Sequence, residues 1–258
     1  MKFSIITPTY KRAEKLLRAV ESLQNQTYAD WEMIIVNDSP HDTSYSDFSS
    51  SINDARIHYH INPHNMGVNY SRNYAISKIS ADSKWVIFLD DDDYFAPDAL
   101  QTFYTLLLLH SDKKWFVTNR ALKNGTPLTR FPEDETTYSY AWKYLLLKIC
   151  KGDATHCIET KLLIHNNIHF SHHIKQGEEW FFFYQVGLHQ KMYYSSHNST
   201  ISDGYDSKEG LNFRKRTKEE RFDSVSKLAH EGVHIKLFRY PSFLLYIIFR
   251  YASIIIKK

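Results

Sequence analysis

Short apolar runs alternate with longer segments of helical periodicity over the first 110 residues. Runs of four to eight apolar residues predict buried strands, and apolar residues three or four positions apart predict helices packed on them. The predicted strands are Phe3–Thr7, Trp31–Val36, Arg56–Ile61 and Trp85–Leu89, and the predicted helices are Arg12–Gln26, Gly67–Ile79 and one that begins at Pro97. This alternation predicts an α/β fold with a mostly parallel central sheet and helices on both faces.

The pattern is less regular after residue 110. A hairpin is predicted around Asn124-Gly125, a dipeptide typical of tight turns, with strands at Trp115–Ala121 and Thr126–Phe131. Further expected elements are a helix at Tyr138–Cys150, a strand or a strand running into a helix at Cys157–Ile164, a helix opened by Gly177-Glu178-Glu179-Trp180, a strand at Lys191–Ser195 and a polar helix at Lys215–Glu231.

Polar clusters follow three of the four predicted strands in the first half. They are Thr7-Pro8-Thr9-Tyr10, Asn37-Asp38-Ser39 and Asp90-Asp91-Asp92-Asp93. Ligands of open parallel sheets bind beyond the carboxyl ends of the strands. We therefore expect the three clusters to meet at one site.

The run Asp90-Asp91-Asp92-Asp93 is the strongest chemical signal in the chain. Adjacent carboxylates repel one another, and hard oxygen ligands in this number suit Mg²⁺ or Mn²⁺ with a phosphate as a further ligand. A solvated acidic turn is the alternative. The neighbouring polar clusters favour the metal interpretation.

The motifs together resemble the family-2 glycosyltransferases of the GT-A fold, of the type that builds bacterial surface polysaccharides. The matching segments are Ser4–Arg12, Ser22–Thr27, Glu32–Ser39, Asn65–Asn73, Phe88–Asp93 and Gly177–Trp180. Asn37 replaces the first of two aspartates in that family's pattern, and Glu179 replaces the aspartate of its late Glu-Asp motif. The resemblance is dense over residues 3–98, thin over 110–200 and absent beyond.

On the donor side, the resemblance implies a nucleotide sugar, with UDP favoured, bound beside the metal. Asp92 would ligate the metal with Asp90, and Asp93 and His197 are further candidate ligands; the spacing Asp91-x-Asp93 also fits the motif. Donor-binding candidates are Thr7, Pro8, Tyr10, Asp38, Arg72, Asp90 and Asp91, with Asp38 on the nucleobase and Arg72 on the diphosphate. Asp38 could instead form a turn, Tyr10 pack in the core, and Arg72 lie on the surface.

On the acceptor side, the resemblance implies inversion in a single displacement, which needs a general base on the acceptor hydroxyl. Glu179 aligns with that base, and its neighbour Glu178 is the second candidate. An acidic first turn that complements the helix dipole is the alternative for both residues.

Composition narrows the classes of partner. A net charge of +3 over 258 residues implies no chain-wide field for polyanions, so no nucleic acid is expected. The two cysteines, Cys150 and Cys157, are expected to be reduced and packed rather than to bind zinc with His156. Neither a signal peptide nor a membrane-spanning segment is expected.

Residues 236–258 contain five basic residues and no acidic one, and Arg250 is the only charge between Phe243 and Ile256. This composition predicts an interfacial helix on an anionic membrane surface. A helix packed on the domain or on a partner chain is the alternative.

We thus expect an inverting, metal-dependent glycosyltransferase at the inner face of the cell membrane. It would move a hexose or N-acetylhexosamine to a glycan or lipid-linked oligosaccharide. Residues 1–110 would bind the nucleotide sugar, 111–215 the acceptor, and 216–258 form a C-terminal extension. An inactive scaffold subunit of the same fold and a nucleotidyltransferase remain the alternatives.

Overall fold

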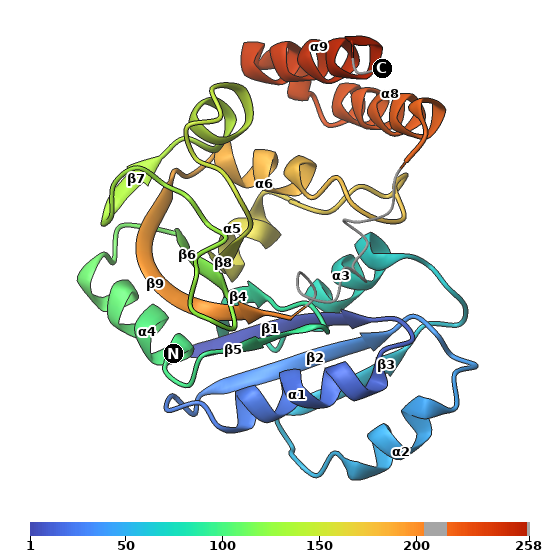
Figure 1. Ribbon diagram of the computed structural model, residues 1–258, viewed down its shortest axis with the longest axis vertical. Helices are drawn as coiled ribbons and strands as arrows, with labels where there is room; N and C mark the ends of the chain where they lie inside the picture. The colour runs from blue at the N-terminus through green and yellow to red at the C-terminus, as the bar shows by residue number, and fades with distance from the viewer. Residues whose placement is uncertain (204–215, 257–258) are drawn as a thin grey trace.

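The computed structural model describes residues 1–203 and 216–256, in which nine strands form one sheet (Figure 1). The strand order is β3-β2-β1-β4-β8-β6-β9-β5, and β7 pairs with β9. The strands are β1 Lys2–Thr9, β2 Trp31–Asn37, β3 Ile57–Ile61, β4 Ser83–Phe88, β5 Asp93–Phe95, β6 Trp115–Leu122, β7 Thr136–Tyr138, β8 Ala154–Glu159 and β9 Met192–Ser202. All of them except β5, β7 and β8 run in the same direction.

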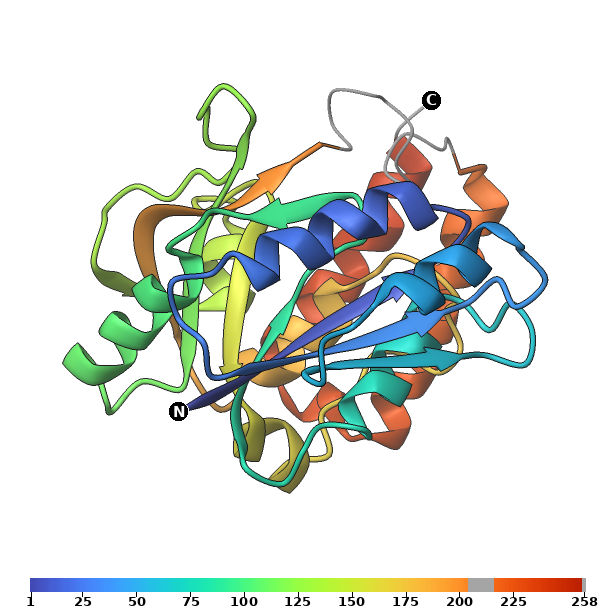
Figure 2. The same cartoon turned by 90° about the horizontal axis from the view of Figure 1, so that it is seen from below.

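Helices cover both faces of the sheet, as Figures 1 and 2 show. One hydrophobic cluster joins β1, β2 and β4 to α1 Ala13–Gln24, α2 Ser44–Ser51 and α4 Ala99–Leu109. The second cluster lies on the other face and includes residues of α3 Val68–Ile76, the π-helix η1 Tyr140–Leu146, α5 Thr160–His165, α6 Trp180–Gly187, α8 Lys218–His234 and α9 Pro241–Ile256. The predicted α/β class with a mostly parallel sheet is confirmed.

Several predicted elements differ from the structure. Thr126–Phe131 is not a strand: the turn at Gly125 forms, but beyond it only isolated bridges at Pro127 and Arg130 remain. Pro127 and Pro132 explain this, because proline cannot donate a ladder hydrogen bond. The segment predicted as a helix from Tyr138 is a strand at β7 and then the shorter η1.

The short elements α2 and β5 were among those that were not predicted. α2 has only Tyr45 and Phe48 as buried apolar anchors in a serine-rich segment, so it lacks a helical periodicity. β5 begins at Asp93, the last aspartate of the acidic run, and pairs with the end of β9. At Cys157–Ile164 a strand runs into a helix, which confirms one of the two predicted alternatives.

The C-terminal helices pack on the domain through α6 and η1. α8 begins with a capping box in which Thr217 and Glu220 satisfy each other's backbone amides, although Lys215, where the helix was expected to begin, lies outside the described residues. α9 buries Phe243, Tyr246 and Ile247 in the same cluster as α6. No described helix is long and apolar enough to cross a membrane.

Two phenylalanines on α9 test this packing. Phe243 is fully buried, whereas Phe249 is 43% exposed. We expect Phe243→Ala to reduce the free energy of unfolding by about 3–5 kcal/mol, because it empties a packed site. Phe249→Ala, the matched control, should cost about 1 kcal/mol or less. Urea unfolding would measure both, and equal small effects would show that α9 is not part of the core.

Candidate functional site

A cavity of about 550 Å³ lies at the carboxyl ends of β1, β2 and β4 and extends to α6 and the C-terminal helices. It contains most of the predicted site residues: Pro8, Tyr10, Asp38, Arg72, Asp90, Asp91, Asp92, Glu178 and Glu179. Three of the candidates, Thr7, Asp93 and His197, do not line it. Thr7 is fully buried in β1, whereas Asp93 lies directly beside the cavity residues on the same turn. The three polar strand ends therefore do meet at one place.

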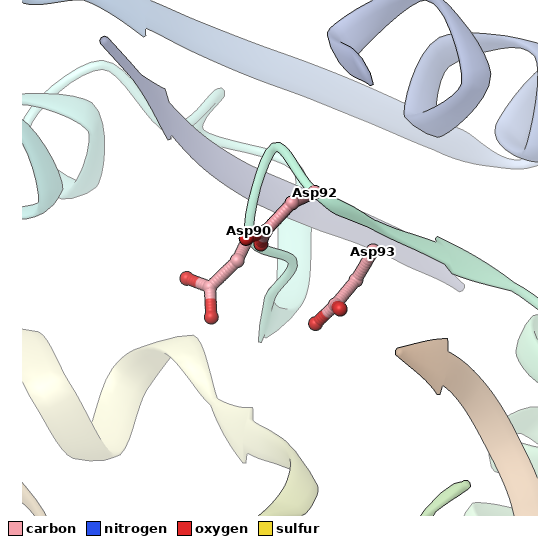
Figure 3. Close-up of side chains that lie close together, drawn as sticks. All are labelled: Asp90, Asp92 and Asp93. Atoms are coloured by element: carbon pink, nitrogen blue, oxygen red, sulfur yellow. The ribbon is translucent and has the colours of Figure 1, made fainter. Parts of the chain in front are cut away.

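The aspartates lie on the turn between β4 and β5 (Figure 3). Carboxylate oxygens of Asp90, Asp92 and Asp93 lie within 4.8 Å of one another, and Asp93 Oδ1 is buried with no hydrogen-bond partner among the described residues. Such a set of hard oxygen atoms fits Mg²⁺ or Mn²⁺. Asp91 has a different role. It accepts hydrogen bonds from Thr9 Oγ1 at 2.8 Å and Arg12 Nη1 at 3.1 Å, and burial raises its pKa to about 6.

Arginines from three different elements meet these carboxylates. Arg12 Nη1 lies 2.9 Å from Asp92, and Arg72 Nη2 lies 2.9 Å from Asp90. Arg120 of β6 pairs with Asp93 and lies 3.4 Å from Asp90. Burial alone would raise the pKa of Asp90, but Arg72 and Arg120 outweigh it and lower the pKa. Arginines from both halves of the sheet therefore neutralise the negative charge of this turn.

Asp38 connects the end of β2 to the loop before α3. Its carboxylate accepts hydrogen bonds from Asn62 Nδ2 at 2.7 Å and from the amides of Met66 at 2.7 Å and Gly67 at 2.8 Å. These contacts fix the Asn-x-Gly segment against the cavity. Asp38 also lines the cavity.

The start of α3 in turn holds the loop that carries Glu178 and Glu179. Asn69 Nδ2 donates to the carbonyls of Ile174 at 2.9 Å and Gly177 at 3.3 Å. A Cβ on Gly67 would lie 2.5 Å from the carbonyl oxygen of Lys175, so only glycine permits this approach. The motif around Gly67 thus supports a loop more than 100 residues away in sequence.

The two glutamates of this loop differ sharply. Glu178 has a side chain only 1% exposed, and it accepts hydrogen bonds from Trp180 Nε1 and Arg216 Nη2, each at 2.6 Å. Arg250 Nη2 lies 2.8 Å from the same carboxylate. Burial would raise the pKa of Glu178, but Arg250 and Arg216 lower it. The Glu179 side chain is 42% exposed and lies 3.2 Å from Arg72.

Sequence reasoning missed the arginine partners and the aromatic side of the cavity. Arg12, Arg120, Arg216 and Arg250 line it, together with Tyr140, Tyr144, Trp180, Phe183 and Tyr246. One signal was available: Arg250 is the only charge in an apolar helix, which suits a buried ion pair. For Arg12 and Arg120 no local pattern distinguished them from surface arginines.

The weaker metal candidates lie apart from the aspartates. His197 lies within β9 rather than after a strand, and its Nε2 lies 3.3 Å from Asp98 Oδ1. Cys150 and Cys157 are buried free thiols, as expected. His156 lines the cavity and accepts a hydrogen bond at Nδ1 from Trp115, and burial lowers its pKa to about 3, so it is neutral.

Comparison with known proteins agrees with this arrangement. The family model described as "Glycosyl transferase family 2" matches residues 4–169. WcaA of Escherichia coli K12, provisionally assigned to colanic acid biosynthesis as a glycosyl transferase, is 38% identical over 103 residues, which are 39% of this chain and 36% of WcaA. The GalNAc(5)-diNAcBac-PP-undecaprenol beta-1,3-glucosyltransferase of Campylobacter jejuni is 36% identical over 103 residues, 39% of this chain and 33% of that protein. The match thus spans about a third of the length of these relatives.

Among solved structures, S. aureus TarS 1–349 in complex with UDP-GlcNAc superposes with a TM-score of 0.71 at 21% identity, over 90% of this chain and 66% of that chain. This likeness shows the GT-A fold. The family match over residues 4–169 establishes that the chain belongs to glycosyl transferase family 2.

Proposed function

We propose that this chain is an inverting glycosyltransferase that moves a sugar from a UDP-sugar to a glycan or lipid-linked acceptor in surface polysaccharide synthesis. One observation carries the proposal. Arg72 bridges Asp90 on the aspartate turn and Glu179 on the α6 loop, at 2.9 and 3.2 Å. A donor held at the turn would therefore have a carboxylate base beside it, within the same cavity.

The donor side supports a nucleotide diphosphate. Asp90, Asp92 and Asp93 would hold Mg²⁺ or Mn²⁺, which when bound neutralises negative charge on the departing diphosphate. Arg72 and Arg12 supply further positive charge at the cavity wall. Asp38 and Tyr10 would border the base, and a carboxylate there suits the imide N–H of uracil. The TarS structure holds UDP-GlcNAc, which agrees with this choice.

The acceptor side supports Glu179 as the base. Glu179 would take the proton of the acceptor hydroxyl as the new bond to the anomeric carbon forms and the bond to UDP breaks. Glu178 is already occupied by two arginines and Trp180, so it is poorly placed for proton transfer.

An inactive scaffold is disfavoured by the position of Asn37. It does not line the cavity; instead it donates to the Tyr59 hydroxyl at 2.8 Å and accepts from Ser39. The departure from the family's aspartate therefore alters a turn and not the donor site. Family membership likewise favours glycosyl transfer over nucleotidyl transfer.

Metal-dependent donor binding is the first expectation. A UDP-sugar at 100 times its dissociation constant stabilises the native state by about 2.7 kcal/mol, which raises Tm by about 5–10 °C in a protein of this size. We expect Mn²⁺ to strengthen this stabilisation in a thermal-shift assay, and Asp92→Asn to remove the metal-dependent part. Asp82→Asn, at an exposed aspartate, is the control. Equal shifts with and without metal in the unchanged protein would refute the metal role.

Loss of the base should separate transfer from donor binding. Glu179→Gln keeps the shape of the side chain but cannot accept the proton, so the transfer rate should fall about 10²–10⁴-fold. Affinity for the UDP-sugar, measured by calorimetry, should stay within about threefold, because Asp90 still holds Arg72. Glu219→Gln at the exposed start of α8 is the control. Transfer at an unchanged rate would exclude Glu179 as the base.

We further propose that the acceptor comes from an anionic membrane surface beside α9. The outward face of α9 is apolar: Leu244, Leu245, Ile248, Phe249, Ile255 and Ile256 are each at least 43% exposed. An exposed helix face is normally polar, and apolar helices with basic neighbours bind at lipid interfaces. Lys148 Nζ lies over the Phe249 ring at 5.7 Å and so joins α9 to the segment after η1.

The segment of residues 136–152, which includes η1, has the same apolar and basic character. Trp142, Leu147 and Ile149 are exposed, and residues 136–152 contain lysines but no acidic residue. Its inner side, through Tyr144 and Lys148, lines the cavity. An acceptor on a lipid carrier would thus reach the cavity from the surface that holds the lipid. The Campylobacter relative, named for an undecaprenol-linked acceptor, agrees with this proposal.

Vesicle flotation tests the membrane contact. We expect binding to vesicles that contain phosphatidylglycerol and weaker binding to neutral vesicles. Ile248→Glu should reduce binding about tenfold, since it places a carboxylate in the apolar face against an anionic surface. Ile61→Glu on β3 is a matched control because Ile61 is 57% and Ile248 55% exposed. Equal losses in both variants, or no binding by the unchanged protein, would refute the proposal.

A further inference from the structure

The loop that presents Glu179 has a backbone conformation that suits Gly177 but is unfavourable for Glu178. Gly177 and Glu178 both lie in the left-handed region, at φ +72° and +63°. A non-glycine residue persists there when surrounding contacts over-determine its conformation. For Glu178 those contacts come from outside the loop.

The contacts converge on the Glu178 carboxylate from three elements. Trp180 reaches it from the first turn of α6, Arg216 from the segment before α8, and Arg250 from α9. The Arg250 guanidinium also lies 5.8 Å from the Trp180 ring and 5.9 Å from the Tyr246 ring. Arg250 thus touches both the carboxylate and the residue that begins α6.

We propose that Arg250, assisted by Arg216, is a positioning residue that holds Glu178 as a buried anion and so fixes the turn that presents Glu179 to the cavity. The proposal rests on the proposed function of Glu179. Both arginines lie beyond residue 169, where the family match ends, and within residues 216–258, the C-terminal extension. The extension then has two sides: an outward apolar face and an inward arginine that completes the active site.

The alternative is that the ion pair only stabilises the fold. Two facts oppose it. Glu178 directly precedes Glu179, so a rotation of its backbone turns the base away from Arg72. The earlier part of the loop, at Ile174 and Gly177, is already held by Asn69, which leaves the part at Glu178 for Arg250 to fix. Misplacement of a catalytic group by about 1 Å can cost about 10²-fold in rate.

The kinetic test uses Arg250→Met, which keeps the apolar stem and removes the charge. We expect kcat for transfer to fall about 10–100-fold while affinity for the UDP-sugar stays within about twofold. Arg250→Lys should restore part of kcat. Glu178→Gln should show the same loss, and the double variant should be no worse than either single variant, because the two residues act as a pair. Arg239→Met, at an exposed arginine of the 3₁₀-helix Leu237–Arg239, is the control.

A second readout does not depend on transfer. The amides of Phe181 and Phe182 donate to the carbonyls of Glu178 and Glu179. We expect faster hydrogen exchange at these amides in Arg250→Met, with exchange in β1 unchanged. If the unchanged protein transfers no sugar, the proposed function fails and exchange alone decides the positioning role. A lower Tm with unchanged kcat and unchanged loop exchange would overturn the proposal, as would additive losses in the double variant. If Arg250→Met does not fold, Arg250→Lys and Glu178→Gln carry the same comparison.

Discussion

Compensation of the aspartate run by arginine is the interaction on which the site depends. Four adjacent carboxylates at the end of a buried strand repel one another, and burial makes each charge more costly. Arg12, Arg72 and Arg120 come from the loop after β1, from α3 and from β6. Each arginine ties a separate element to one turn. The turn therefore adds side-chain ion pairs between the parallel half of the sheet and its later strands, which the β4–β8 ladder already joins.

Arg72 extends this network to the loop that carries Glu179. It is 7% exposed and lies between Asp90 and Glu179. A single buried cation thus sets the separation between the aspartate turn and the loop that carries Glu179. Because Arg72 pairs with both Asp90 and Glu179, a movement of either carboxylate displaces the guanidinium that binds the other.

The first half of the fold could be predicted because its signals are local. Apolar runs bounded by polar clusters gave β1 to β4, and their common direction brought Asp38 and Asp90 together. Local patterns could not predict contacts between residues that are far apart in the sequence. Arg120 meets Asp93 across 27 positions and Asn69 meets Gly177 across 108, and neither pair leaves a periodic trace. β5 was missed because three residues are too few to show alternation. Glu178 and Glu179 were found only through the family motif. Their different surroundings depend on Arg250, which pairs with Glu178 and which sequence reasoning treated as part of a lipid-facing helix.

Arg250 follows Glu178 by 72 residues, and this order has a consequence for the newly made chain. Ribosomes add roughly 5–20 residues per second, and N-terminal parts fold first. The aspartate turn and its arginines are in place only once β8, which lies between β4 and β6 in the sheet, has emerged, whereas Glu178 waits about 4–14 s for Arg250 at that rate. Under the proposed function, the ability to hold a sugar nucleotide would therefore precede the ability to activate a hydroxyl. With the proposed base placed last, an incomplete chain would transfer little of its donor sugar to water.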